Sequence, residues 1–197
     1  MSPSRDEVQR ALDQLTDIHA QVTRASIYRG YRAAPVAGMG FVAWTVATCE
    51  ALWAGNIGPR AHAMVWLGVA LLCATIGAAD LWRRRDAVSG RDTWTAVGQL
   101  LPALVVGVAM TWLLSDQPEL LPGVWTSLFG LGVLASRPYL PAPILGVAVF
   151  YVTAGLAMAA AARAGVSPSP WAMGLTFLVG QLSAAAVLRR SSEGVTG

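Results

Sequence analysis

Residues 34–54, APVAGMGFVAWTVATCEALWA, decide the fold class of this chain. A helix needs about twenty predominantly apolar residues to cross roughly 30 Å of hydrocarbon, and this stretch reaches that length with one charged residue, Glu50. We therefore predict an all-α fold, a polytopic transmembrane bundle of six spans within residues 33–188. The other five blocks lie near 63–82, 94–114, 121–136, 142–162 and 170–188.

The block at residues 121–136 is the shortest and is rich in glycine. A short span tilts little, thins the bilayer locally or is partly buried by its neighbours. Small residues also recur at every fourth position in three other blocks, which would let helix backbones approach closely. These stripes are Ala70, Ala74 and Ala78; Ala103, Gly107 and Thr111; and Thr176, Gly180 and Ala184.

The composition is that of a multi-pass membrane protein, because 55% of the residues are hydrophobic and 13% are charged. The net charge of +3 does not indicate nucleic-acid binding, since the positive residues lie between apolar blocks, where orientation in a membrane explains them. We expect the lipid bilayer as a partner and no nucleic acid. Two cysteines, both inside apolar blocks, are too few for a disulfide framework or a zinc site.

The arginines predict the orientation. With six spans and a cytoplasmic N-terminus, twelve of the 14 basic residues are cytoplasmic, and Arg60 and Arg163 lie outside. That is a strong positive-inside bias. All 14 are arginine, which indicates GC-rich coding and a bacterial source. We predict a multi-pass protein of the bacterial inner membrane with both termini cytoplasmic, residues 189–197 forming a short cytoplasmic tail.

Residues 1–32 are predicted to form a cytoplasmic amphipathic helix followed by an arginine-containing juxtamembrane segment. Ser4 and Glu7 match a capping box at the start of this helix. Apolar residues then follow a spacing of three and four, which places them on one stripe of the helix. We call this the docking stripe: Val8, Ala11, Leu15, Ile18, Val22 and Ala25.

Something must cover the docking stripe. The opposite face carries Asp13 and Asp17, unlike the arginine-rich face of a helix that lies on a membrane. Two alternatives therefore stay open for residues 4–26: docking on the cytoplasmic face of the same bundle, or binding of a cytoplasmic protein partner.

Glu50 is the charged residue of the first span, and an intramembrane acid is a functional candidate. It faces the short outer turn that contains Arg60 and His62, either of which could pair with it. We interpret the three residues as a candidate outer ion pair that ties the first hairpin together. The alternative is a proton-coupling role.

A second candidate polar cluster consists of Asp80, Gln99, Gln181 and Arg32. Counting about 1.5 Å of rise per residue puts both glutamines roughly 8–10 Å from the cytoplasmic surface. Equal depth predicts an interhelical hydrogen bond between them. The functional alternative is the polar floor of a cavity open to the cytoplasm, with Asp80 and Arg32 at its rim.

The inventory of residues disfavours several chemistries. His19 lies in the N-terminal segment and His62 at a boundary, so two histidines do not face each other inside spans for a haem. We find no Ser-His or Cys-His arrangement at matching depth and no phosphate-binding glycine loop. We expect no catalytic residues, cofactor or metal.

Four stretches carry a resemblance. They are IYRGYR at 27–32, GQLLPALVVG at 98–107, LPGVWTSLFGLGVLASRPYLP at 121–141 and SPWAMGLTFLVGQLSAA at 169–185. Through these four stretches the chain resembles a family of uncharacterised bacterial six-helix integral membrane proteins with no assigned activity. The resemblance implies a six-helix inner-membrane protein in a family associated with neighbouring winged-helix transcriptional regulators. It brings no catalytic residues, and Glu50 belongs to none of its motifs.

We therefore expect a non-enzymatic inner-membrane protein, an anchoring, sensing or regulatory component that engages a cytoplasmic partner through its N-terminal helix. The alternative is a small-solute or proton-coupled permease whose cytoplasm-facing polar site contains Asp80, Gln99 and Gln181.

Overall fold

The structure, a computed structural model, is entirely helical in its regular elements over the residues that it describes: 9, 14–16, 32–53, 57–83, 98–99, 101–167 and 169–193. The predicted all-α fold class is confirmed for these residues. Their elements are α2 (Ala33–Trp53), α3 (Pro59–Arg83), α5 (Leu101–Leu113), η1 (Pro118–Leu120), α6 (Leu121–Ala135), η2 (Arg137–Tyr139), α7 (Ile144–Arg163) and α8 (Pro170–Glu193).

Five helical segments in the described residues are long and apolar enough to cross a membrane. The fourth predicted span is one of them, because η1 extends α6 into an 18-residue segment, Pro118–Ala135. The third is the exception. Its described helix, α5, has 13 residues, or about 20 Å, and is short of the roughly 30 Å of a hydrocarbon core. Five such segments suggest a membrane-embedded protein, and the third predicted span is represented by this shorter helix.

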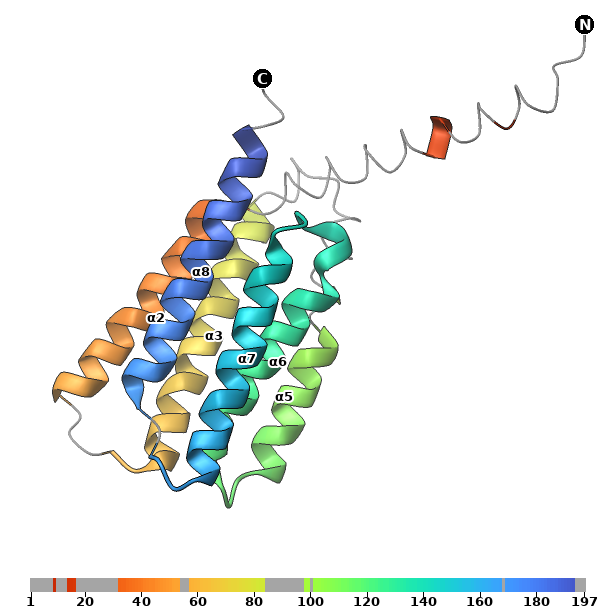
Figure 1. The fold of residues 1–197 in the computed structure, drawn as a ribbon. Helices are drawn as coiled ribbons and strands as arrows, with labels where there is room; N and C mark the ends of the chain where they lie inside the picture. Colours follow the sequence, from red (N-terminus) through yellow and green to blue (C-terminus); the bar gives the residue numbers. More distant parts are fainter. Residues whose placement is uncertain are drawn as a thin grey trace, which may run out of the picture.

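Successive helices run antiparallel (Figure 1). One end of the bundle, which we call the hairpin end, is where α2, α5 and α7 finish and α3, η1 and α8 begin. At this end α3, η1 and α8 each begin with a proline: Pro59, Pro118 and Pro170. Proline suits the first turn of a helix because its missing N–H would have no intrahelical partner there. α2 begins and α8 finishes at the opposite end (Figure 1).

Two helix pairs pack most closely, α2 with α8 and α6 with α7. In the second pair the backbones touch. A Cβ atom on Gly155 would lie 2.5 Å from the backbone nitrogen of Ser127, and one on Gly123 would lie 2.5 Å from that of Ala159. Close backbone approach through small residues is how membrane helices associate when lipid is as apolar as their side chains.

The apolar core has two parts. One gathers Ala43 and Ala47 of α2, Trp66 and Val69 of α3 and Met173 of α8. The other gathers Ile144, Val147 and Tyr151 of α7. Phe177 of α8 packs against both parts, so α8 joins the α2–α3 side of the bundle to the α6–α7 side.

The predicted N-terminal amphipathic helix lies mostly outside the described residues. Gln9 and residues 14–16 are helical. Of the docking stripe only Leu15 is described, and its side chain is 62% exposed. The capping box at Ser4 and Glu7 and the other five stripe residues lie outside the described residues, so the helix stays a prediction.

Candidate functional site

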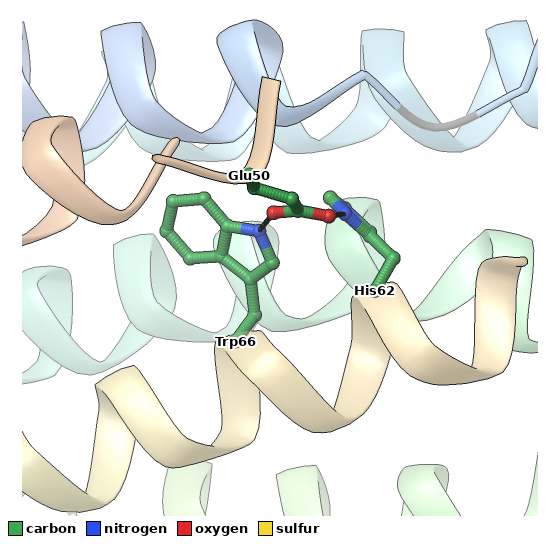
Figure 2. Close-up of polar contacts among 3 residues, drawn as sticks. All are labelled: Glu50, His62 and Trp66. Carbon is green, nitrogen blue, oxygen red and sulfur yellow. Dashed lines mark hydrogen bonds and ion pairs between the residues drawn. The ribbon is translucent and has the colours of Figure 1, made fainter. Parts of the chain in front are cut away.

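A buried polar group at the hairpin end joins α2 to α3 (Figure 2). Glu50 lies in the last turn of α2, and His62 and Trp66 lie in the first two turns of α3. Residues four apart share one face of a helix, so the imidazole and the indole both point towards α2. The carboxylate of Glu50 lies between the two rings (Figure 2). We call these three residues the polar triad.

Both oxygens of the Glu50 carboxylate are used. Oε1 pairs with Nδ1 of His62, and the indole Nε1–H of Trp66 donates a hydrogen bond of 3.1 Å to Oε2. The residues are almost completely enclosed, with exposed fractions of 5% for Glu50, 3% for His62 and 3% for Trp66. A buried charge needs such partners, because an unpaired polar group in a low-dielectric interior is costly.

The triad owes its geometry to the contact between helices. An acid in the last turn of a helix is disfavoured by the helix dipole by about 0.3–1 kcal/mol, so Glu50 does not stabilise α2 locally. Other buried polar side chains behave differently. Ser136 hydrogen-bonds only to a carbonyl of its own helix, Gly132 O at 3.0 Å, and Thr126 hydrogen-bonds to Pro122 O at 2.8 Å, with Sδ of Met173 on α8 as a weaker second acceptor at 3.4 Å. Glu50 instead bonds across to α3.

One ring nitrogen of the triad has no hydrogen-bond partner in the described part of the chain. Nε2 of His62 is buried and has no hydrogen-bond partner among the residues that the structure describes. Leaving a buried donor or acceptor unpaired costs about 1–3 kcal/mol. A carboxylate that holds one imidazole nitrogen orients the ring and leaves the other nitrogen available, the arrangement found in proton-transfer and metal sites. No group of three or more His, Cys, Asp or Glu residues that could hold a metal occurs in the described part of the chain.

A small cavity lies close to the triad at the hairpin end. Its volume is about 100 Å³, and its polar lining residues are Glu119, Ser167 and Ser169. Met173 lines this cavity and also packs in the same apolar cluster as Trp66. The remaining walls come from the ends of α6, α7 and α8 and are apolar.

The structure brings together two of the three residues of the predicted outer ion pair. Glu50 and His62 are in contact, whereas Arg60 is exposed and the ion pair of Glu50 is made with His62. Trp66 was not predicted. The signal that could have found it is its spacing of four from His62, which places the indole N–H on the face that carries the imidazole.

No hydrogen bond between Gln99 and Gln181 is present among the described residues, and Gln99 lies in a turn just before α5. α5 packs on α6, whereas α8 packs on α2 and α7. Figure 1 shows α5 at the edge of the bundle beside α6. Gln181 is buried against α2. A Cβ atom added to Gly40 of α2 would lie 2.9 Å from the Cβ atom of Gln181. Gln99 is half-buried.

The other two members of the predicted polar cluster lie on different elements. Asp80 is half-buried near the end of α3, and Arg32 is exposed immediately before α2. Arg84, which follows Asp80 by four residues in the sequence, lies outside the described residues. The four residues belong to different segments of the described chain, and their clustering around the two glutamines stays a prediction.

No protein-family model, no curated protein and no solved structure matches this chain. The resemblance to an uncharacterised bacterial membrane family thus stays an interpretation of the sequence, and the function has to be argued from the site itself.

Proposed function

We propose that this chain is a non-enzymatic sensing and regulatory component of the bacterial inner membrane, in which α2 connects the polar triad to the N-terminal segment. The observation that carries the proposal is the position of Glu50. It lies three residues from the end of α2, and Ala33 at the other end follows directly on residues 1–32. The 21 residues of α2 span about 30 Å, the thickness of a hydrocarbon core.

The packing supports movement of α2 with α8 and relative to α3. α2 packs much more closely on α8 than on α3. The contact with α3 instead depends on side chains. These are chiefly the polar triad and the apolar cluster around Ala43, Ala47 and Val69. A change in the triad would therefore alter the α2–α3 contact first, and α2 would carry the change to its other end.

The orientation of the bundle follows from the arginines. Both basic residues of the predicted outer segments, Arg60 and Arg163, belong to the hairpin end of the structure. We propose that this end faces outward and that both chain termini are cytoplasmic. In a Cys49→Ser, Cys73→Ser background, an impermeant maleimide should label Asp116→Cys in intact cells and label Arg137→Cys only after permeabilisation. Labelling with the opposite preference would reverse the orientation.

The partner is proposed to dock on the stripe of residues 4–26. Leu15, the described member of this stripe, is 62% exposed, so its side chain is accessible to a partner. The experiment is affinity capture from gently solubilised native membranes with the intact chain, with a chain lacking residues 1–32, and with Leu15→Asp. Gln14→Asp is the matched control, because it introduces the same residue one position off the stripe.

A cytoplasmic protein recovered with the intact chain and Gln14→Asp, but lost in the other two, is the expected result. Its yield should also change in Glu50→Gln if the triad regulates docking. Equal recovery from the intact chain, the chain lacking residues 1–32, Leu15→Asp and Gln14→Asp would show that residues 1–32 bind no partner. The permease alternative is not argued further, because no hydrogen bond joins Gln99 to Gln181 in the described part of the chain.

A further inference from the structure

We infer that Glu50 and His62 together form a proton-binding site, and that the proton held there keeps the hairpin end of α2 and α3 closed. This inference rests on the sensing role proposed above and names its signal, the proton concentration on the side of the hairpin end. Three observations carry it: the buried contact between the carboxylate and Nδ1, the unpartnered Nε2 and the scarcity of other charges nearby.

The first step concerns net charge in the closed state. With one proton between them, a carboxylate and an imidazole have no net charge, whether the proton sits on nitrogen or on oxygen. Removal of that proton leaves a buried negative charge, and addition of a second leaves a buried positive charge. Because a buried net charge is strongly disfavoured, the closed pair holds one proton.

The second step concerns the neighbours that could compensate such a charge. On α3 the nearest charged side chain is Arg60, and on α7 it is Arg163; both are exposed. The turn after α5 carries the exposed Asp116, and η1 carries the half-buried Glu119 at the neighbouring cavity. The first turn of α8 has no acidic residue, and α6 has no charged residue at all. Cys49 and Cys73 are half-buried thiols on α2 and α3.

The third step is the open state, in which α2 and α3 separate at the hairpin end and water reaches both groups. A solvated imidazole releases its proton near pH 6.5 and a solvated carboxyl group near pH 4.3, both approximate values. Above about pH 6.5 the open pair therefore holds no proton, whereas the closed pair holds one. Opening then releases a proton, so rising pH favours the open state by up to tenfold per pH unit.

The unpartnered nitrogen makes opening easier. In the closed state Nε2 of His62 is buried without a described protein group as a partner. Water would satisfy it once the helix ends separate, so its burial favours the open state at every pH. The shared proton opposes that tendency. The two effects together make the α2–α3 contact sensitive to the loss of one proton.

The test measures the distance between spin labels on α2 and α3 in the full chain, reconstituted in lipid nanodiscs. Leu52→Cys and Met64→Cys are suitable label sites, because both side chains are exposed near the hairpin end. Cys49 and Cys73 are replaced by serine. A second pair, Leu131→Cys on α6 and Val149→Cys on α7, is the control, since both are exposed on the closely packed helices.

We expect one short distance at pH 6 and a longer-distance population whose ratio to the short one grows by up to tenfold per pH unit above about pH 6.5. The control pair should not change. Glu50→Gln should abolish the pH dependence above about pH 6.5, whereas Arg60→Gln and Glu119→Gln should preserve it. His62→Gln should move the onset of the pH dependence down to about pH 4.3, because the buried carboxyl group alone still holds a proton that it releases on opening. A pH-independent distance in the parent chain, or an unchanged pH dependence in Glu50→Gln, would overturn the inference.

This measurement needs no partner, so it separates the two proposals. If the distance responds to pH but no protein is captured through residues 1–32, the proton site stands and the regulatory function fails. If capture depends on residues 1–32 but the distance ignores pH, the regulatory function stands and the proton fails as its signal.

Discussion

The α6–α7 and α2–α3 contacts join neighbouring antiparallel helices of the same bundle by different means. α6 and α7 touch backbone to backbone, so a Cβ atom on Gly155 would lie 2.6 Å from the carbonyl oxygen of Gly123. α2 and α3 stand further apart and are joined by the carboxylate of Glu50 and its two ring partners. A contact made by backbone shape responds little to solution conditions, whereas a contact made by a buried charge responds to whatever changes that charge.

The largest effect is expected where the backbones touch. Gly155→Leu places a side chain 2.5 Å from the Ser127 nitrogen, so the helices must separate. We expect a loss of about 3 kcal/mol or more in the free energy of unfolding, at the upper end of overpacking effects. Thermal unfolding of the purified protein in detergent measures it. Gly146→Leu is the control on the same helix, because no atom lies within 4 Å of its Cβ position. Equal stability of the two variants would refute the close packing.

A smaller effect is expected in the polar triad. Glu50→Ala leaves the donors of His62 and Trp66 without their acceptor, which should cost about 2 kcal/mol. Replacing both polar partners is less harmful than replacing one, so Glu50→Leu with His62→Leu should recover part of that loss. Unfolding in detergent again provides the values. Arg60→Gln should change stability by less than about 0.5 kcal/mol, since the side chain is exposed. A full additive loss in the double variant would argue against a coupled pair.

The smallest effect isolates one hydrogen bond. Trp66→Phe keeps an aromatic ring in the apolar cluster but removes the donor to Oε2 of Glu50, and we expect a loss of about 1 kcal/mol. The same substitution in a Glu50→Leu background is the matched control, because it removes the same ring volume at the same buried site, where the carboxylate acceptor is absent. A comparable loss in both variants would mean that ring volume, and not the hydrogen bond to Glu50, accounts for the change.

The comparison also shows what the sequence could predict. The apolar blocks predicted the helices because span length follows from bilayer thickness alone. The proximity of Glu50 and His62 was also predictable, since α2 finishes at Trp53 and α3 begins at Pro59, which leaves their side chains at the same end. A short connection makes adjacent helices neighbours in space.

Pairings between helices distant in sequence were not predictable in the same way. Gln99 and Gln181 were matched by depth, but residue counting gives a position along the bundle axis and does not say which helices are neighbours. The small-residue stripes were a mixed guide. Ala70, Ala74 and Ala78 are exposed on α3. Gly180 of the third stripe is buried, and a Cβ atom on it would overlap the ring of Tyr151, whereas the closest backbone approach uses Gly123 and Gly155, which lie outside the three stripes.

The packing of α2 on α8 has a consequence for how the protein is made. The face of α2 that carries Gly40 and Ala47 is covered by Leu178, Gln181 and Gly174 of α8. Translation reaches Pro170 only after more than a hundred further residues, a delay on the order of ten seconds at about 5–20 residues per second. α6 and α7, joined by a short connection, can pair as soon as both leave the ribosome. The first span therefore waits in the nascent chain for its main partner, and a ribosome that stalls before α8 leaves that face of α2 exposed to the insertion and quality-control machinery.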